Sequence, residues 1–254
     1  MTTLDTRLPG LLKGSKPLFG MFVGLASPAI VEMCGHAGFD FVILDNEHGP
    51  ASIETTEHLI RAARCVNMIP IVRTLESDIL RVLDIGASGI QVPQVNTAEQ
   101  ARRIVAAAKY PPVGNRGAAF SPRAAGYGFF GGPAHAKASN EGIGVILMIE
   151  TPEALGNLDE ILAVPGIDVL FIGPNDLSFA MGHEGNQKHP DVVTAIDGAI
   201  KKIARTKVAA GLMTIPLEDQ RRYAALGARY LTSQIAAVIG GALKNTVTAM
   251  RALQ

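Results

Sequence analysis

The chain alternates eight times between a short apolar run and a longer stretch with the period of a helix. Gly, Pro or polar residues bound the apolar runs, which is the pattern of parallel βα units. The predicted strands are residues 18–23, 39–44, 69–73, 89–93, 144–149, 169–172, 210–214 and 230–233. The predicted helices include residues 52–65, 77–83, 97–109, 153–163, 190–206, 217–226 and 238–253.

Eight strands in 254 residues match what a closed parallel barrel requires. A doubly wound sheet normally has fewer strands and a glycine fingerprint in its first turn, and no GxGxxG motif follows the first predicted strand. Ser52 and Thr97 stand where N-terminal caps of two helices are expected. The sequence therefore predicts an α/β fold, a single (β/α)8 TIM barrel domain over residues 1–254.

Charge and composition exclude several classes of partner. The 23 basic and 23 acidic side chains cancel and no basic run is present, so nucleic acid is not an expected partner. No apolar run approaches the roughly 18 residues of a membrane span, and residues 1–10 lack the pattern of a secretory leader. Cys34 and Cys65 show no CxxC spacing, and we expect two buried, reduced thiols. These features predict a cytoplasmic protein with no membrane partner.

Residues 111–142 interrupt the regular alternation. The segment is rich in Gly, Pro and Ala and carries the aromatic residues Tyr127, Phe129 and Phe130. Structureless connections of this length usually cover a site or form an interface. Two interpretations stay open: a lid or subunit contact, which the aromatic residues favour, and a solvated insertion with one short helix around residues 134–139.

Polar side chains gather at the ends of four predicted strands. In a parallel barrel the catalytic groups lie at the carboxyl ends of the strands. Ordinary solvated charges of this chain fall on predicted helices, whereas these residues directly follow apolar runs. They are Asp45, Asn46, Glu47 and His48 after the second strand, Arg73 after the third, Glu150 after the fifth, and Asn175 and Asp176 after the sixth.

Glu150 and Asp176 follow consecutive strands, so in a barrel they converge as a carboxylate pair. Two close carboxylates repel each other unless they share a proton or a cation. A hard divalent metal ion, with its other positions left to water and substrate, satisfies both. The structural alternative is that Asp176 caps a turn and Glu150 pairs with Arg73.

His48 is a candidate proton carrier, because a histidine at a strand end titrates near neutral pH. A carboxylate on its other ring nitrogen would fix the tautomer and raise its basicity. Asp84, which closes the helical stretch after Arg73, is the candidate for that role. Its place just before Gly86 is also typical of an ordinary helix end.

Two other chemistries known on comparable folds are not expected. All nine lysines lie in predicted helices, loops or tails, so none projects from a strand to form a Schiff base. Serine hydrolysis lacks its GxSxG motif, and Ser233, the one serine at a strand end, has no obvious base.

Taken together, these motifs resemble the metal-dependent class II pyruvate aldolases of the HpcH/HpaI aldolase and citrate lyase group. That group includes 4-hydroxy-2-oxoheptanedioate and 2-dehydro-3-deoxyglucarate aldolases. The resemblance runs from about Leu18 to Arg251 and keeps the order and spacing of the motifs. The motifs are Asp45-x-Glu47-His48-Gly49, Val72-Arg73, Leu83-Asp84-x-Gly86, Tyr110-Pro111-Pro112 with Gly114-x-Arg116-Gly117, Ile149-Glu150-Thr151 and Phe171-Ile172-Gly173-Pro174-x-Asp176-Leu177-Ser178.

The resemblance implies a role for each of these residues. Glu150 and Asp176 would bind a divalent ion, usually magnesium, manganese or cobalt, that chelates pyruvate. Arg73 would stabilise the enolate, and His48 would transfer protons. Asp84 would raise the basicity of His48, and the backbone around Asn175 and Asp176 would receive the substrate carboxylate. Asp45 and Glu47 would support these residues without contacting the substrate.

The resemblance also implies reversible cleavage of 4-hydroxy-2-oxo acids into pyruvate and an aldehyde. It further implies a homo-oligomer, commonly a hexamer that exchanges terminal helices. The last predicted helix fits that expectation, since residues 238–253 carry an apolar stripe.

Two positions depart from the family pattern. Asn46 stands where the family commonly has glycine, and Met148 stands where it commonly has glutamine. Strand period places Met148 on the same face as Glu150, so the pocket lacks an amide and the acceptor specificity stays open. The alternatives to the aldolase are a citrate-lyase-like acyl-CoA lyase, suggested by the Glu150-Thr151-Pro152-Glu153-Ala154 motif, and a non-catalytic scaffold barrel.

Overall fold

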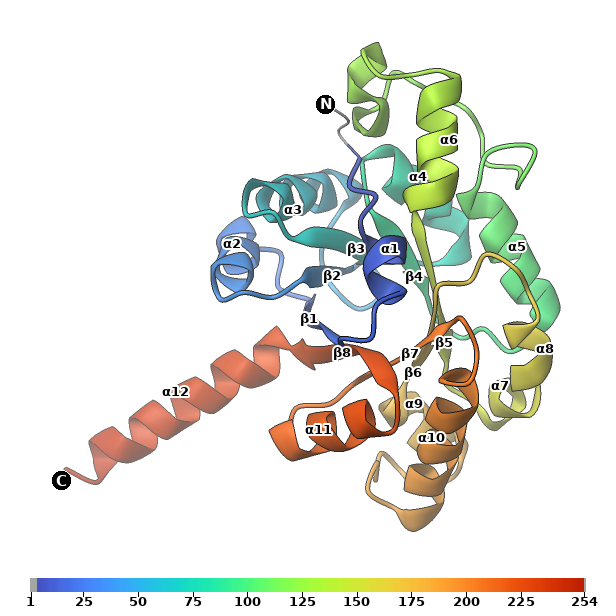
Figure 1. Cartoon of the computed structure of the whole chain (residues 1–254). Helices are drawn as coiled ribbons and strands as arrows, with labels where there is room; N and C mark the ends of the chain where they lie inside the picture. Colours follow the sequence, from blue (N-terminus) through green and yellow to red (C-terminus); the bar gives the residue numbers. More distant parts are fainter. Residues whose placement is uncertain (1–3, 254) are drawn as a thin grey trace.

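A computed structural model describes residues 4–253 and shows a closed barrel of parallel strands, joined in sequence order β1 to β8 (Figure 1). The predicted (β/α)8 TIM barrel is thereby confirmed. Each strand pairs with the next, and β8 closes the ring on β1. The strands are β1 Leu18–Val23, β2 Phe41–Asp45, β3 Ile69–Arg73, β4 Gly89–Val92, β5 Gly144–Ile149, β6 Val169–Ile172, β7 Ala209–Met213 and β8 Ala228–Gln234.

Helices surround the barrel on the outside (Figure 1). The α-helices are α1 Leu8–Leu12, α2 Pro28–His36, α3 Ile53–Cys65, α4 Ile79–Asp84, α5 Ala98–Ala108, α6 Pro133–Gly142, α7 Pro152–Gly156, α8 Leu158–Leu162, α9 Pro174–Ala180, α10 Pro190–Ile203, α11 Leu217–Ala225 and α12 Ile235–Arg251. Two 3-10 helices, η1 Glu76–Asp78 and η2 Arg123–Gly128, complete the set. Among residues 4–253, no helix combines the length and apolarity needed to cross a membrane.

The predicted helix starts are confirmed where a polar side chain caps the chain. The Ser52 hydroxyl accepts the backbone N–H of Thr55 at the start of α3. Thr97 and Gln100 form a complete capping box at the start of α5. These caps satisfy amide groups that have no partner inside the helix.

The structure corrects several of the predicted elements. The strand predicted at residues 39–44 is shifted toward its carboxyl end, so Asp45 itself pairs with Arg73 in the parallel ladder. The helix predicted at 153–163 is two short helices, α7 and α8, because the chain leaves helical geometry at Asn157, whose side chain donates to the backbone oxygen of Asn96. The predicted list omitted α9, whose Gly-Pro start has the local character of a turn.

Large side chains fill the barrel interior instead of leaving a pore. The ring of Phe41 on β2 stacks on Tyr230 of β8 with centroids 4.2 Å apart. Gly20 on β1 makes this possible, because a Cβ there would stand 2.0 Å from the Phe41 ring. Leu8 and Leu12 of α1 pack against the same interior cluster and close its amino-terminal end. The opposite, carboxyl end is therefore the open one.

Residues 111–142 fold into η2 and α6 with connecting turns. Helix α6 confirms the short helix expected around residues 134–139. The aromatic tip is exposed, and 86% of the Phe129 surface is open to solvent. The two cysteines are free, Cys34 is buried as predicted, and Cys65, at the last position of α3, is exposed. The prediction of two buried thiols was wrong for Cys65, because it falls on the outward face of its helix.

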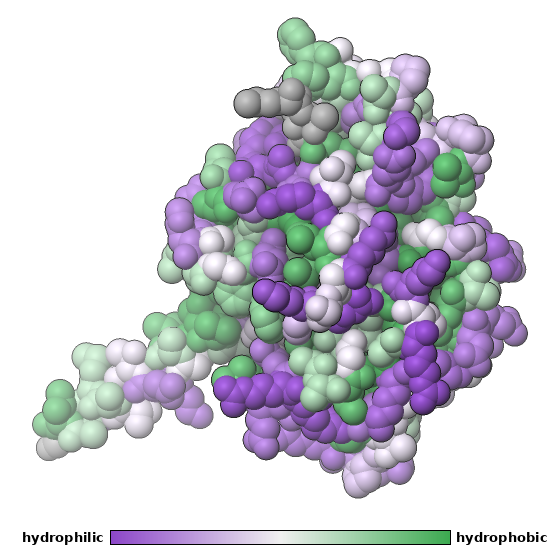
Figure 2. Space-filling model, viewed as in Figure 1, coloured by the Kyte–Doolittle hydropathy of each residue, from purple (hydrophilic) through white to green (hydrophobic). Residues whose placement is uncertain are grey.

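Helix α12 departs from the ring. In Figure 1 it projects from the barrel toward the lower left, and Figure 2 shows hydrophobic surface along it. Only its first residue, Ile235, is buried. Val238, Leu243, Val247 and Met250 are exposed along its length.

Candidate active site

Two connected cavities open at the carboxyl end of the barrel. An inner cavity of about 70 Å³ lies between the ends of β5 and β6, and an outer one of about 780 Å³ extends toward α10 and α11. Arg73, Asn175 and Asp176 line both cavities. Glu150 lines the inner cavity and His48 the outer one. The structure therefore brings the polar residues at the strand ends together, as the parallel topology predicted.

The side of the site formed by β2 and β3 is held by a two-pronged ion pair. Arg73 donates from Nε to Asp45 Oδ1 at 2.9 Å and from Nη2 to Asp45 Oδ2 at 2.6 Å. Arg73 Nη1 also lies 3.1 Å from Glu47 Oε2. Burial alone would raise the pKa of Asp45, but the hydrogen bonds and charge of Arg73 outweigh burial and hold that pKa below its usual value. Asp45 and Glu47 thus both contact the Arg73 guanidinium, and their supporting role in the site stays a prediction.

The turn after β2 places His48 at the rim. Asp45 Oδ1 accepts the backbone N–H groups of Glu47 at 3.1 Å and His48 at 3.2 Å. Gly49 completes the turn, since a Cβ there would stand 2.2 Å from the Asp45 carbonyl oxygen. The His48 side chain is 68% exposed, and its Nε2 lies 3.8 Å from Glu47 Oε2. A ring in this position can exchange protons between the outer cavity and water.

The side formed by β5 and β6 carries a carboxylate of the opposite character. Glu150 is only 2% exposed, and its Oε2 accepts the backbone N–H of Gln94 at 2.8 Å. Burial, together with the negative charges of Asp176 and Glu47, raises the pKa of Glu150 to about 7, against the Gln94 hydrogen bond and the charge of Arg73. Within the described residues, Glu150 and Asp176 form no ion pair with a basic side chain.

A divalent cation fits this carboxylate pair. The fold makes room for the Glu150 carboxylate, because a Cβ on Gly173 would stand 2.5 Å from its Oε1. Two carboxylates that line one cavity, where the charge of Asp176 helps to raise the pKa of Glu150, are an oxygen donor set for a hard ion such as Mg²⁺. Two protein oxygens also leave coordination positions for substrate and water. Glu150 and Asp176 are therefore suited to hold the metal that the sequence predicted.

The floor of the inner cavity is apolar. Phe22, Met148, Phe171 and Met213 line it below the carboxylates. The guanidinium of Arg73 lies 5.0 Å from the centre of the Phe22 ring. Met148 thus faces the cavity beside Glu150, as strand period predicted, and supplies no hydrogen bond there.

Asp84 lies apart from this set. Its Oδ1 accepts a hydrogen bond from Arg116 Nη2 at 2.8 Å, and the Arg116 guanidinium lies over the ring of Tyr110. Within residues 4–253 no bond joins Asp84 to His48, whose carboxylate neighbour is Glu47. The role of Asp84 in raising the basicity of His48 finds no support within one chain and stays a prediction.

The structure decides against the structural alternative for Glu150. Arg73 is bound to Asp45 and Glu47, and only its longer-range charge acts on Glu150. The sequence did not single out Gln94, which holds a left-handed backbone (φ 54°) while its N–H points at Glu150. It also missed Gln187 and Gln234, which line both cavities. Gln234 carried a usable signal, since it is the last residue of β8, whereas Gln187 lies in a turn with no local pattern.

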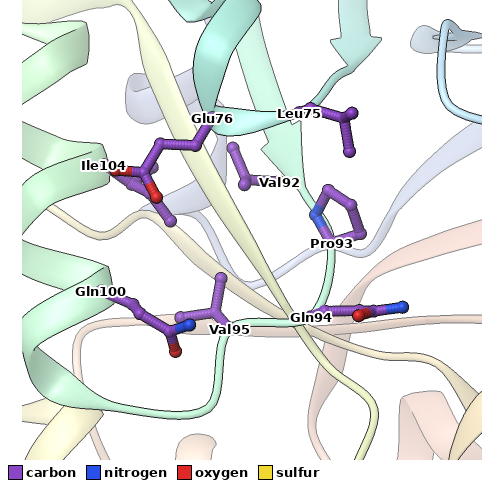
Figure 3. A pocket seen from close by; sticks show the side chains of 8 residues that line it. All are labelled: Leu75, Glu76, Val92, Pro93, Gln94, Val95, Gln100 and Ile104. Atoms are coloured by element: carbon purple, nitrogen blue, oxygen red, sulfur yellow. The ribbon is translucent and has the colours of Figure 1, made fainter.

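A third cavity, of about 70 Å³, lies between the loop after β4 and helix α5 (Figure 3). Two of the polar side chains that line it, Glu76 and Gln100, already have partners. Glu76 pairs with Arg103 at 3.2 Å, and the Gln100 side chain accepts the backbone N–H of Thr97. This cavity is therefore a packing feature behind Gln94.

Comparison with known proteins agrees with this arrangement. A 2-dehydro-3,6-dideoxy-6-sulfogluconate aldolase from Pseudomonas putida is 41% identical over 206 residues, which cover 80% of each chain. A 4-hydroxy-2-oxo-heptane-1,7-dioate aldolase from Klebsiella pneumoniae is 39% identical over 224 residues, covering 87% of this chain and 84% of the relative. The crystal structure of an HpcH/HpaI aldolase/citrate lyase family protein from Burkholderia cenocepacia matches with a TM-score of 0.92 at 29% identity, over 97% of this chain and all of the other.

The family model described as HpcH/HpaI aldolase/citrate lyase matches residues 18–235. That span runs from the first residue of β1 to the first residue of α12 and includes every residue of the two cavities named above. The chain belongs to the HpcH/HpaI aldolase/citrate lyase family.

Proposed function

We propose that this chain is a divalent-metal-dependent pyruvate aldolase that reversibly cleaves 4-hydroxy-2-oxo acids into pyruvate and an aldehyde. The observation that carries the proposal is the carboxylate pair Glu150 and Asp176, of which Glu150 is buried and Asp176 is exposed. Within residues 4–253 neither forms an ion pair with a basic side chain, and Arg73 lines the same inner cavity. Such a carboxylate pair can bind a cation, and the arginine can bind an anion. Aldol cleavage needs both, because negative charge develops on the keto oxygen next to the breaking bond.

Glu150 and Asp176 would hold the ion, with Mg²⁺, Mn²⁺ and Co²⁺ as the candidates. When bound, the ion supplies Lewis-acid stabilisation of charge on a substrate oxygen. Arg73 adds a fixed positive charge from the other side. Two of its N–H groups donate to Asp45, and its Nη1 lies within ion-pair distance of Glu47. The N–H groups that do not bond Asp45 would be available to a substrate oxygen. Positioned donors of this kind are each worth about 3 to 4 kcal/mol of barrier.

His48 is proposed as the proton carrier. It would accept the proton of the 4-hydroxyl group, either directly or through one water molecule, while the bond between C3 and C4 breaks. The electron pair of that bond forms the enolate, and a proton delivered to C3 then gives pyruvate. The backbone N–H groups of Asn175 and Asp176, which lie in the first turn of α9, would receive the substrate carboxylate.

Pyruvate release from a panel of 4-hydroxy-2-oxo acids tests the proposal directly. We expect activity with Mg²⁺, Mn²⁺ or Co²⁺, loss of activity on exhaustive chelation, and recovery when the ion is restored. In Glu150→Gln we expect kcat/KM to fall by about 10³ or more with the fold retained, since this change removes one of two ligands. Glu153→Gln, an exposed acid on α7, is the matched control. Full activity after chelation would exclude the metal mechanism.

The family name also includes citrate lyase, so cleavage of an acyl-CoA thioester is the second candidate. The relatives compared above, at 41% and 39% identity, are both aldolases, and the Asp45-x-Glu47-His48 run and Arg73, which favour the aldolase branch, meet in the bidentate Asp45–Arg73 pair. Assaying pyruvate-dependent aldol addition against acyl-CoA cleavage with one preparation separates the two. Acyl-CoA cleavage without aldol activity would reverse our assignment.

We further propose a homo-oligomer, with a hexamer that exchanges α12 as the expected form. Helix α12 leaves its apolar side chains exposed, and the loop tip at Phe129 and Phe130 adds a second apolar surface. A second copy of the chain would bury both. Sedimentation analysis at micromolar concentration should show an assembly, and a monomeric mass would contradict it. Two free cysteines, in turn, support the proposed cytoplasmic location.

A further inference from the structure

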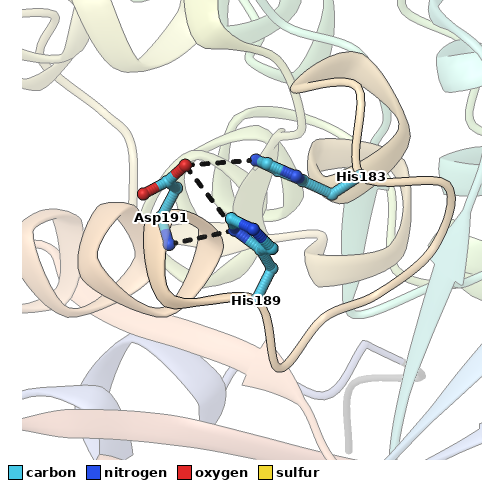
Figure 4. Close-up of side chains that lie close together, drawn as sticks. All are labelled: His183, His189 and Asp191. Carbon is cyan, nitrogen blue, oxygen red and sulfur yellow. Dashed lines mark hydrogen bonds and ion pairs between the residues drawn. The ribbon is translucent and has the colours of Figure 1, made fainter.

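A second group of metal-ligating side chains lies outside the pair just described. His183 Nε2 lies 3.5 Å from Asp191 Oδ2, and His189 Nδ1 lies 3.6 Å from the same oxygen. Figure 4 shows both rings directed at this carboxylate. The imidazole rings are stacked with centroids 3.6 Å apart and planes at 17°. The donor atoms of all three residues lie within 4.8 Å of one another.

The chain holds this group in place through its backbone. The His183 N–H donates to the Ser178 carbonyl of α9 at 2.8 Å, and the His189 N–H donates to the Asn186 carbonyl at 3.0 Å. His189 is also the N-cap of α10, where its Nδ1 accepts the Asp191 N–H at 3.3 Å. Helix capping accounts for His189, but it needs neither His183 nor the carboxylate of Asp191. The convergence of the two rings on one oxygen is therefore an additional feature.

The donor set points to a particular class of ion. Two imidazole nitrogens and one carboxylate oxygen suit Zn²⁺, and also Ni²⁺ and Cu²⁺, whereas Mg²⁺ prefers oxygen ligands only. Zinc bonds of about 2.0 to 2.1 Å place tetrahedral donors roughly 3.3 Å apart, close to the two distances to Asp191. Occupation requires a small side-chain rotation that frees His189 Nδ1 from the Asp191 N–H. The fourth position is left to water.

The position of the group connects it with the large cavity. His183 and His189 bracket a turn whose residues Gln187 and Lys188 line the outer cavity. Gln187 also lines the inner one. The same turn follows α9, whose first turn carries Asp176. An ion joining both ends of the turn to Asp191 would fix this part of the cavity wall.

We propose that His183, His189 and Asp191 form a second cation site of the Zn²⁺ class, distinct from the Glu150 and Asp176 pair, which fixes the turn over residues 183–189. Binding at this site does not depend on the aldolase assignment. Its influence on the cavity wall deepens the proposed function and rests on it.

The test is Zn²⁺ binding to the full chain in the presence of saturating Mg²⁺, which occupies the oxygen site. Competition with a chromogenic chelator measures affinity and stoichiometry. We expect one Zn²⁺ per chain, and an affinity at least about tenfold weaker in both His183→Gln and His189→Gln. His36→Gln, a change at an exposed histidine of α2, is the matched control and should bind as the unaltered chain does. Equal affinity in His183→Gln and the unaltered chain would overturn the site.

A second measurement tests the effect on the turn. Zn²⁺ should slow hydrogen exchange of the backbone amides of residues 183–189 in the unaltered chain and leave His183→Gln unchanged. Mg²⁺-dependent pyruvate release by His183→Gln without Zn²⁺ should stay within about twofold of the unaltered chain. Zinc binding without slower exchange would refute the fixing of the turn. Loss of pyruvate release in every preparation, with Zn²⁺ binding intact, would instead count against the proposed function.

Discussion

The two sides of the barrel mouth contain the same kinds of residue in opposite electrostatic states. On the β2 and β3 side, Asp45 is paired with Arg73 through two hydrogen bonds and its pKa is lowered. On the β5 and β6 side, Glu150 is more deeply buried, has no basic partner among residues 4–253, and its pKa is raised to about 7. Burial acts in the same direction on both carboxyls. The presence or absence of a neighbouring guanidinium decides the outcome.

The difference assigns a task to each side. A paired carboxylate is already satisfied, so Asp45 positions Arg73 and the turn that carries His48. An unpaired buried carboxylate is costly for the fold unless something else stabilises its charge. The β2 and β3 side is therefore preorganised for an anion and for proton transfer, and the β5 and β6 side for a cation.

The largest expected effect on the paired side follows the loss of its proton carrier. His48→Ala should lower kcat by roughly 10² to 10⁴, the usual range for general acid-base catalysis. Metal affinity should hardly change, because the change leaves Glu150 and Asp176 intact. Steady-state kinetics together with Mn²⁺ titration checks both points, with His58→Ala on α3 as the control. If metal binding is lost instead, His48 is a metal ligand, and the two sides of the barrel mouth do not have separate tasks.

Arg73→Lys tests whether the arginine acts on the substrate or only balances charge. It keeps the positive charge but loses the planar fork that binds Asp45. We expect kcat to fall by about 10² or more with a smaller change in KM, since the lost contact strengthens as charge develops. Exchange of the pyruvate methyl protons should slow as well. Near-normal proton exchange in both Arg73→Lys and Arg73→Ala would reduce Arg73 to a structural counter-charge.

Glu150→Gln tests how much the unpaired Glu150 carboxylate lowers the free energy of unfolding. The folded state keeps the Glu150 proton up to about pH 7, whereas the unfolded carboxyl loses it from about pH 4.5. Folding is therefore progressively disfavoured as the pH rises through this range. At about 1.4 kcal/mol per pKa unit the full effect is at most about 3.5 kcal/mol.

Denaturant unfolding of the metal-free protein measures this cost. The free energy of unfolding of Glu150→Gln minus that of the unaltered chain should be larger at pH 8 than at pH 4.5. The increase should not exceed that limit. Mg²⁺ should narrow the gap by stabilising the unaltered chain. Glu153→Gln serves as the control. A stability difference that does not vary with pH would mean that the two sides do not differ in the way described.

The smallest effect concerns Met148 on the floor of the inner cavity. Met148→Gln adds an amide beside Glu150, where the surroundings are Phe22, Phe171 and Met213. We expect a shift of up to about tenfold in kcat/KM in favour of hydroxypyruvate over pyruvate as the enolate donor, because the amide can bond the extra hydroxyl. Met33→Gln, at an exposed position of α2, is the control. An unchanged ratio would show that this floor does not select the donor.

Much of the fold follows from local patterns. Period and helix caps predicted every strand and most helices, because alternation and capping act over a few residues of chain. The errors fall where local signals conflict. Helix α9 begins with Gly-Pro, and Asn157 divides a continuous helical period into α7 and α8.

The site divides in the same way. Parallel topology alone brings strand ends together, so His48, Arg73, Glu150 and Asp176 could be located in one mouth from the sequence. The residues that form hydrogen bonds or ion pairs with each of these side chains could not be predicted from the sequence. Gln94 reaches Glu150 from the loop after β4, and Arg116 takes Asp84 from 32 positions along the chain.

The sequence by itself determined the barrel, the open end and the set of polar residues that meet there, because each depends on periodicity and strand direction. Only the tertiary structure decided that Arg73 pairs with Asp45 and that Glu150 has no basic partner in the described part of the chain. That choice depends on the register of β2 against β3, where Asp45 and Arg73 lie side by side. Register and loop conformation set distances between residues far apart in sequence, and these distances determine which charges are neutralised.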